Sequence, residues 1–274
     1  MTYEHYLTEL KTNGFVVGKN IIPQDMINKI TESLKKTFID QLKNLGLRHE
    51  NDDLFYLMQS LHKNNIEKYK KTLSALWRKF DVYEFMHSPH IINFVKNVMN
   101  WEDLFLPGGQ VVHIMAEELK IPDGYFGIHP HQDFPSVQGS LDGLVTWVPL
   151  VDVSEKNYSM DVLPKSHLNG ILPTNQDNSD TWKTDESAYD ASKFYTINAN
   201  AGDIVLMTNF TLHRSSLLGD NKNYRLAISN RLDNANEPTF IERCYPSAYI
   251  RNIQREQFVE NFPKVEQVKE IFKN

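Results

Sequence analysis

His131-Gln132-Asp133, together with a second histidine farther along, His213, decides how this chain is interpreted. Alternate residues of a strand point to the same side, so His131 and Asp133 can reach one ion while Gln132 faces elsewhere. Two imidazoles and one carboxylate can occupy one face of an octahedral Fe(II) ion and leave three positions open. The pattern therefore predicts a metal site formed by His131, Asp133 and His213.

A His-x-Asp triplet is a weak signal by itself, because it also occurs at the ends of ordinary surface strands. His129 has the same strand parity as His131 and is a rival ligand. Pro130 disturbs the strand between the two histidines, and only His131 has the His-x-Asp spacing. We therefore favour His131, and the ordinary surface strand remains the alternative.

Arg225 follows His213 by about the length of a hairpin, and residues 215–223 are rich in turn formers. If the turn is centred on Gly219, His213 and Arg225 lie opposite each other. A buried guanidinium needs an anionic partner, and its planar fork suits a carboxylate. Arg225 is thus expected to anchor the far end of a dicarboxylate beside the metal. The alternative is a partly exposed strand arginine paired with an aspartate.

The sequence around these motifs indicates a β-rich second half. Short β-rich runs alternate with turn residues and have no helices between them, which is typical of an antiparallel sandwich or jelly roll. The predicted strands are residues 110–115, 144–151, 161–163, 193–197, 203–207 and 224–232.

The first hundred residues are mainly helical in pattern, with one short strand at residues 15–17. Helices are predicted at residues 3–12, from Pro23 onward, and at 53–63, 66–80 and 89–99. We expect them to lie against the outside of one sheet. The predicted organisation is a single domain over residues 1–274, with helical support (1–103), a jelly-roll core (104–232) and a C-terminal extension (233–274).

Residues 167–192 interrupt the β pattern with a polar segment in which Trp182 and Tyr189 are isolated. Long loops in compact domains are often functional. We consider a lid over a pocket and a plain surface insertion equally compatible with this segment.

Composition narrows the classes of partner. The chain has 274 residues, 41% hydrophobic and 23% charged, with a formal net charge of −6. A net acidic chain without a basic groove argues against nucleic acid. Cys244 is the single cysteine, so an intrachain disulfide and a thiolate metal cluster are excluded. Neither a signal peptide nor a membrane span is indicated. We therefore expect a cytoplasmic protein acting on a small molecule, and the oligomeric state is left open.

Four motifs in order resemble the phytanoyl-CoA dioxygenase-like family of Fe(II)/2-oxoglutarate-dependent oxygenases. They are His131-Gln132-Asp133, the run from Leu144 to Leu150, the stretch from Val162 to His167, and Gly202-Asp203 followed by His213-Arg214-Ser215 and Tyr224-Arg225. The resemblance covers roughly residues 104–232, and the helices before them also look like this family. It implies a double-stranded β-helix (jelly-roll, cupin-like) core.

The resemblance also implies roles for individual residues. His131, Asp133 and His213 match the metal ligands. Arg225 matches the arginine that binds the distal carboxylate of 2-oxoglutarate, and Ser215 matches a hydroxyl that assists it. Trp147 falls where the family often places an aromatic residue beside the co-substrate, although a core position is equally compatible. Gln110 and His113, on a predicted strand, could line the pocket as well.

The implied reaction uses Fe(II), 2-oxoglutarate and O2 to oxidise a C–H bond and releases succinate and CO2. Hydroxylation is the expected outcome, with desaturation or ring closure as variants. Asp133 is retained, which disfavours halogenation, since halogenating relatives have a small residue there. The chain departs from the family at Ser159-Met160-Asp161 and Pro164-Lys165-Ser166-His167, which affects the loop near the substrate.

Two alternatives remain at this point: a non-oxidative metal-dependent isomerase or epimerase, and a carbohydrate-binding β-sandwich. The substrate is open among small metabolites. Residues that could face it by position are Arg214, Tyr125, Phe134, Trp182 and Tyr189.

Overall fold

The structure is a computed structural model that describes residues 1–48, 50–122, 126–137, 139–176, 182–220 and 222–238. By internal contacts the chain divides into a unit of residues 1–240 and a unit of residues 241–274. The second unit, with Cys244 and most of the predicted C-terminal extension, lies outside the described residues. A single domain over the whole chain therefore stays a prediction.

Helices form the first third of the chain, as the sequence predicts. They are α1 (Tyr3–Asn13), α2 (Gln24–Asn44), α3 (Leu54–Asn64), α4 (Ile66–Leu76), α5 (Phe80–Met86) and α6 (Pro89–Met99). Their ends have local causes. The Thr2 side chain accepts a hydrogen bond from the His5 backbone at the start of α1, and Gly14 ends it with a φ of 86°. The single helix predicted at residues 66–80 is wrong: α4 stops at Leu76 and a separate α5 follows.

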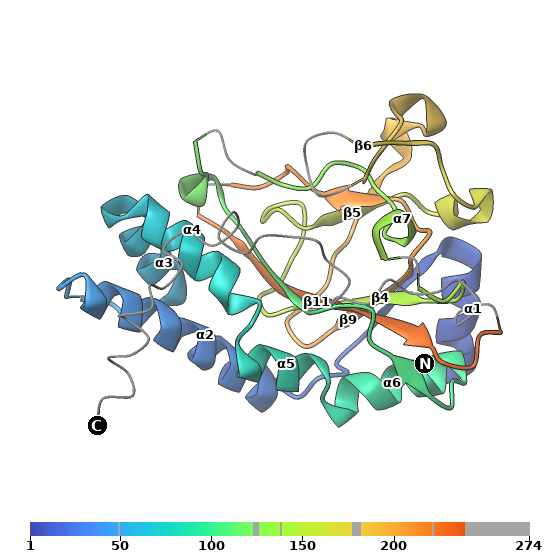
Figure 1. Cartoon of the computed structure of the whole chain (residues 1–274), viewed down its shortest axis with the longest axis horizontal. Coiled ribbons are helices and arrows are strands. Elements are labelled where there is room, and N and C mark those ends of the chain that lie inside the picture. The colour runs from blue at the N-terminus through green and yellow to red at the C-terminus, as the bar shows by residue number, and fades with distance from the viewer. Residues whose placement is uncertain (49, 123–125, 138, 177–181, 221, 239–274) are drawn as a thin grey trace, which may run out of the picture. The chain divides into compact units, whose positions relative to one another are not determined.

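The larger sheet is antiparallel, with strand order β1 (Phe15–Gly18), β9 (Ile204–Thr208), β4 (Leu144–Pro149), β11 (Arg225–Asn234) and β2 (Leu104–Phe105). β3 (Val111–Met115) also pairs with β11. One face of this sheet lies against the helices (Figure 1). That layer is apolar because alternate strand residues meet the buried stripes of the helices, and each fully buried large side chain contributes roughly 1.5–3 kcal/mol. It includes Leu34, Phe38, Ile91, Val95, Val148, Leu206 and Ile228.

The smaller sheet consists of β10 (His213–Ser215), β5 (Met160–Val162) and β8 (Tyr195–Thr196). Its inner face packs on the inner face of the larger sheet. Val145, Trp147, Val205, Met207 and Ala227 contribute from the larger sheet, and Met160, Val162, Ile197 and Ala199 belong to the same cluster. Two antiparallel sheets with an apolar layer between them confirm the predicted jelly-roll core.

The remaining elements are short. They are η1 (Glu117–Leu119), α7 (Phe134–Val137), η2 (Ser166–Asn169), η3 (Glu186–Ala188), η4 (Ala191–Lys193) and a hairpin of β6 (Thr174–Gln176) and β7 (Trp182–Thr184). The hairpin and the two 3-10 turns after it make up most of the predicted insertion, of which residues 177–181 are not described.

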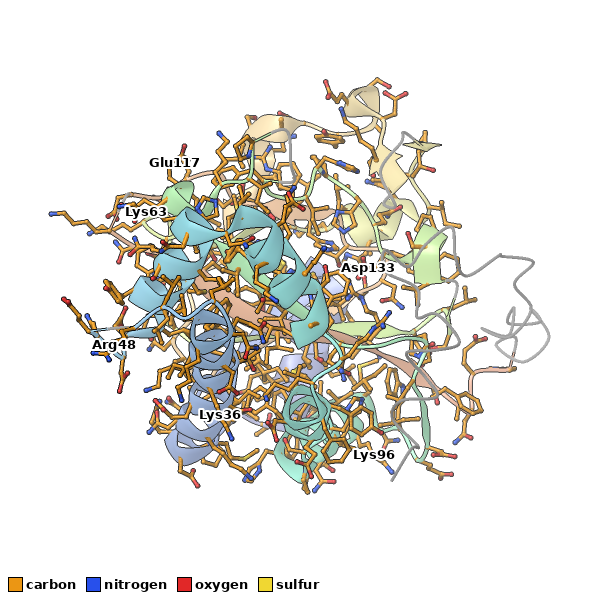
Figure 2. All side chains as sticks on the ribbon, turned by 60° about the vertical axis from the view of Figure 1, so that its left-hand side comes forward. Lys36, Arg48, Lys63, Lys96, Glu117 and Asp133 are labelled. Carbon is orange, nitrogen blue, oxygen red and sulfur yellow. The ribbon has the colours of Figure 1, made fainter. Side chains whose placement is uncertain are left out.

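Charged side chains of the helical layer lie on its outside. Lys36 and Lys63 are exposed, and Figure 2 shows them on the helices, away from Asp133. Among the described residues, none of the helices has both the length and the apolar composition that crossing a bilayer requires.

Candidate metal centre

His131 forms an isolated antiparallel β-bridge with His213, which lies on β10 of the smaller sheet. The backbone N–H of each donates to the carbonyl of the other, at 3.0 and 3.1 Å. Their side chains therefore leave the sheet on the same side, and their ring centroids lie 4.2 Å apart. Strand pairing thus brings together two histidines that are distant in sequence.

Both imidazole rings are oriented by backbone carbonyls. His131 Nδ1 lies 2.8 Å from the His129 carbonyl oxygen, and His213 Nδ1 lies 3.0 Å from that of Thr211. A carbonyl only accepts, so each ring carries its proton on Nδ1 and keeps the lone pair of Nε2 free. Metal-binding histidines are oriented in this way. His129, the rival ligand, contributes its backbone carbonyl to this arrangement.

Asp133 completes the group. Its Oδ1 lies 3.4 Å from His131 Nε2. In the described part of the chain, His131, Asp133 and His213 are buried and offer ligand atoms that all lie within 4.8 Å of one another. Two imidazole nitrogens and one carboxylate oxygen are a donor set that suits Fe(II) and leaves coordination positions open. The residues present therefore fit the predicted metal.

Electrostatics keeps Asp133 and His213 in the protonation states that a metal ligand needs. Burial raises the pKa of Asp133, but the Arg231 cation beside its carboxylate outweighs this effect, so that pKa lies well below its usual range. Burial, and then His131, lowers the pKa of His213 to about 4. A metal can thus bind at neutral pH without displacing a proton from either residue.

The low pKa of His213 predicts a pH-dependent stability of the metal-free protein. Between pH 6.5 and about 4, His213 takes up a proton in the unfolded chain but not in the folded one. The free energy of unfolding should therefore fall as the pH drops through this window, by up to about 1.4 kcal/mol per pH unit for this group. Urea unfolding across the window measures the slope.

In that experiment His213→Gln should flatten the slope. His90→Gln, which removes an exposed imidazole from α6, is the matched control. An unchanged slope in His213→Gln would show that this histidine is not the titrating group.

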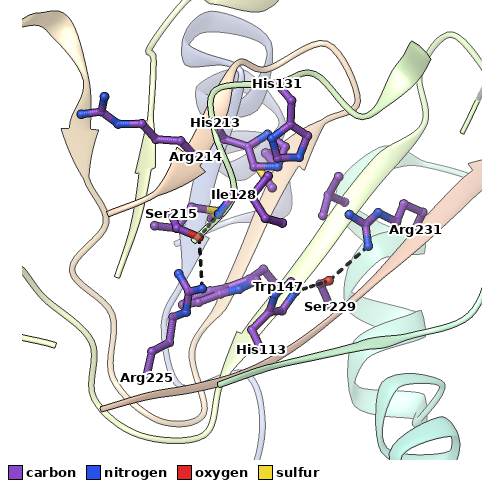
Figure 3. Close-up of a pocket in the computed structure, with 13 residues that line it drawn as sticks. His113, Ile128, His131, Trp147, His213, Arg214, Ser215, Arg225, Ser229 and Arg231 are labelled. Atoms are coloured by element: carbon purple, nitrogen blue, oxygen red, sulfur yellow. Dashed lines mark hydrogen bonds between the residues drawn. The ribbon is translucent and has the colours of Figure 1, made fainter. Parts of the chain in front are cut away.

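Arg225 lines the same cavity as the two histidines and is 4% exposed. Its Nη2 donates to Ser215 Oγ at 3.2 Å (Figure 3). Its Nη1 donates to the Ser159 carbonyl at 3.1 Å. The Ile128 backbone N–H also donates to Ser215 Oγ, at 3.0 Å. The predicted association of Arg225 with Ser215 is therefore a direct contact.

The route by which Arg225 reaches this position differs from the predicted hairpin. β10 pairs with β5, whereas β11 pairs with β3, β4 and β2 in the other sheet. His213 and Arg225 are consequently not opposed across a turn centred on Gly219, and that prediction is wrong. They approach each other because the two sheets face one another across the cavity.

Two further predicted residues line the cavity. Trp147 on β4 is cross-strand partner of both Ser229 and Val205, and it is also part of the apolar layer between the sheets. Trp147 is therefore both a core residue and a residue of the cavity lining, so the structure agrees with both interpretations. His113 on β3 lies opposite Ala227 and hydrogen-bonds Ser229 Oγ through Nε2 at 2.9 Å.

Gln110 requires a correction. Its amide Nε2 donates to the Trp77 carbonyl at 2.7 Å, and it does not belong to the described cavity lining. The reason is strand parity: Gln110 shares the face of Val112, which packs into the helical layer, whereas His113 faces the cavity. Gln110 ties the start of β3 to the end of α4.

Two residues at the site were missed in the sequence. Arg231 donates from Nε and Nη2 to Asp133 Oδ2 at 2.9 and 2.8 Å. The sequence could have indicated Arg231, because Arg225 and Arg231 are an even number of residues apart on one strand and therefore face the same side. Gln132, between the two ligands, is fully buried and donates to the carbonyls of Gly170 and Phe210. Its Oε1 accepts from the Leu172 backbone.

The base of the insertion is thereby attached to the metal-binding segment. Besides the Gln132 hydrogen bonds, the Thr184 backbone N–H on β7 donates to the Pro130 carbonyl at 2.9 Å. The hairpin that contains Trp182 thus starts and ends beside His131. Its function as a lid stays a prediction.

The candidate substrate-facing residues fall into different environments. Arg214 pairs with Asp161 at 3.0 Å and lies over the Phe194 ring, and Figure 3 shows its guanidinium turned away from the histidines. Phe134 is buried and stacks on Phe210. Tyr189 contacts Phe194 edge to face. Tyr125 and the side chain of Trp182 lie outside the described residues.

Comparison with known proteins agrees with this geometry. The family model of phytanoyl-CoA dioxygenase (PhyH) matches residues 10–217, which is most of the chain. The chain belongs to the phytanoyl-CoA dioxygenase family. This confirms the resemblance inferred from the four motifs. Among curated proteins, no sequence matches the chain.

Solved structures share the fold of this family member at low sequence identity. The epimerase SnoN, in complex with Fe3+, alpha ketoglutarate and nogalamycin RO, is similar with a TM-score of 0.56 and 18% identity over 85% of this chain and 84% of that chain. The non-heme monooxygenase ThoJ has a TM-score of 0.56 and 15% identity over 84% and 77% of the two chains.

EctD from S. alaskensis, in its apo form, has a TM-score of 0.52 and 12% identity over 86% of this chain and 82% of that chain. At such identities these likenesses show the fold alone. Family and fold together establish an oxygenase-type jelly roll with a buried His/Asp/His site.

Proposed function

We propose that the protein is an Fe(II)- and 2-oxoglutarate-dependent oxygenase that hydroxylates a C–H bond of a small metabolite. The proposed reaction converts 2-oxoglutarate, O2 and R–H into succinate, CO2 and R–OH. The observation that carries the proposal is the convergence of His131, Asp133 and His213 on one point, with the Arg225 guanidinium in the same cavity. When bound, Fe(II) with 2-oxoglutarate would activate O2 for an oxidation that amino acid side chains cannot carry out.

The side chains around the centre would bind and orient the co-substrate. Arg225 presents a planar set of donors, and Ser215 Oγ lies 3.2 Å from its Nη2, so one carboxylate could be bound by both residues. Arg225 reaches the cavity from β11, whereas His213 lies on β10 of the smaller sheet and His131 pairs with it. A dicarboxylate could therefore lie between the metal and Arg225.

The cavity walls would exclude water from the reaction. Val145, Trp147, Met160 and Met207 line it and belong to the apolar layer between the sheets. A site closed by apolar side chains protects a reactive oxidant from side reactions and strengthens the interactions of Arg225.

An Fe(II)- and 2-oxoglutarate-dependent epimerisation is the second candidate. Its support is that SnoN, which has the same fold, is described as a non-heme alpha ketoglutarate dependent epimerase. Hydrogen abstraction is common to both reactions, so product analysis needs to cover inverted as well as hydroxylated compounds. Desaturation and ring closure are further outcomes of the same abstraction.

The test is succinate formation from 2-oxoglutarate by protein reconstituted with Fe(II) in air, with a panel of amino acids, sugars and natural-product precursors. Succinate release should depend on both Fe(II) and 2-oxoglutarate, and a substrate should stimulate it. A non-oxidative isomerase or a carbohydrate-binding protein would convert its ligand, or bind it, without consuming 2-oxoglutarate. That result would reject the proposal.

A further inference from the structure

We propose that Arg231 is a positioning residue. It binds one oxygen of the Asp133 carboxylate, so that this carboxylate ligates the metal through its other oxygen alone. The inference rests on the proposed Fe(II) site. Ser229 and His113 are assigned a supporting part, in which they hold the Arg231 side chain in place.

The first observation is that the two carboxylate oxygens of Asp133 have different neighbours. Oδ2 accepts both hydrogen bonds from Arg231, at 2.9 and 2.8 Å, whereas Oδ1 lies 3.4 Å from His131 Nε2. The carboxylate torsion of an aspartate is intrinsically broad. A carboxylate that is free to turn can bind a metal through one oxygen or both. With Oδ2 bound to the guanidinium, only Oδ1 faces the histidines.

The second observation is that further hydrogen bonds fix the position of the Arg231 side chain. Its Nη1 donates to Ser229 Oγ at 3.2 Å, and Ser229 Oγ lies 2.9 Å from His113 Nε2 (Figure 3). An arginine can only donate, so the serine oxygen accepts this bond and its proton can go to His113. Burial, followed by the Arg225 and Arg231 cations, lowers the pKa of His113 well below its usual value, so the ring is neutral and has one nitrogen that can accept this proton.

Strand geometry explains why these residues meet. Arg225, Ser229 and Arg231 lie at alternate positions of β11 and face the cavity, and His113 comes from the neighbouring strand β3. One strand thus supplies an arginine at each end of the cavity. Arg225 lies beside Ser215, and Arg231 lies beside the ligand carboxylate.

Charge repulsion indicates that Arg231 acts by orienting the Asp133 carboxylate and not by strengthening metal binding. A guanidinium beside a divalent cation repels it and therefore opposes metal binding. Arg231 would therefore be a poor device for raising metal affinity. Its benefit is that a one-oxygen ligand leaves three coordination positions open, two of which a chelating co-substrate needs.

The experiment compares wild type with Arg231→Met and Arg231→Lys, each loaded anaerobically with Co(II), whose visible spectrum reports coordination. Without 2-oxoglutarate, Arg231→Met should bind Co(II) at least as tightly as wild type but with a changed spectrum. Its affinity for 2-oxoglutarate should fall by about tenfold or more. Arg231→Lys should lie between the two, because an ammonium restores the charge but not the planar pair of donors.

Ser229→Ala is the second variant, in case Arg231→Met does not fold. It keeps the Arg231–Asp133 pair and removes only the support, so a smaller change in the same direction is expected. Arg78→Met, which removes an exposed arginine after α4, is the control and should match wild type.

The outcomes separate this inference from the proposed function. Wild-type protein that binds neither Co(II) nor Fe(II) would reject the metal site itself. An Arg231→Met variant with the wild-type Co(II) spectrum would overturn the positioning role. Weaker 2-oxoglutarate binding with that unchanged spectrum would also overturn it, because it would mean direct contact between Arg231 and the co-substrate.

Discussion

Asp133→Ala is expected to abolish 2-oxoglutarate turnover, with a loss of succinate formation on the order of 10³-fold or more, equivalent to about 4 kcal/mol. The physical reason is that Asp133 supplies the one anionic ligand of the proposed centre. The measurement is succinate released per enzyme in the presence of Fe(II), with far-UV circular dichroism to establish that the fold is kept.

Asp133→Ala also leaves the Arg231 guanidinium without its carboxylate, and breaking a buried pair in this way is costly. Its melting temperature should therefore fall although the fold is retained. Asp133→Asn keeps an oxygen that Arg231 can donate to, so it should lose turnover with a smaller loss of stability. Asp40→Ala, at an exposed site on α2, is the matched control. Retained turnover in both Asp133 variants would remove the ligand role.

Arg225→Met is expected to weaken 2-oxoglutarate binding on the order of 100-fold, because a charge-assisted bidentate contact in a buried site is lost. Fe(II) binding in the absence of 2-oxoglutarate should be nearly unchanged, since Arg225 donates to Ser159 and Ser215, while the Asp133 carboxylate is paired with Arg231. Titration of 2-oxoglutarate into the Fe(II)-loaded protein separates the two effects.

Two companion variants sharpen this prediction. Arg225→Lys should recover only part of the affinity, since lysine has the charge without the planar donors. Ser215→Ala should cost less than tenfold, the order expected for one neutral hydrogen bond. Saturation of Arg225→Met at the wild-type concentration of 2-oxoglutarate would show that this arginine does not bind the co-substrate.

The helical layer was largely predictable because its signals are local. α6 begins with a proline and ends at Asn100 in a left-handed conformation, and its boundaries match the prediction at 89–99. The break between α4 and α5 was not predictable, because its cause is tertiary. The Trp77 carbonyl accepts from Gln110, and its indole donates to the Val112 carbonyl, so the end of α4 is fixed against β3.

The site was predictable in its residues but not in its assembly. His-x-Asp spacing pointed to two of the three side chains that the structure brings together, and His213 followed from the motif that contains it. The pairing of β10 with β5 depends on contacts between distant segments, and a hairpin therefore remained the simplest interpretation of Arg225. For Arg231, the spacing along the strand was enough to predict that the side chain faces the cavity. Its pairing with Asp133 is evident only from the structure.

The most direct test of the central claim is an anaerobic titration of the metal-free protein with Fe(II) and then 2-oxoglutarate. If His131, Asp133, His213 and Arg225 form one site, wild type should develop a weak charge-transfer band in the visible. Asp133→Ala should fail to develop it, and Arg225→Met should require far more 2-oxoglutarate. A wild-type protein that stays colourless at saturating Fe(II) and 2-oxoglutarate would contradict the assignment.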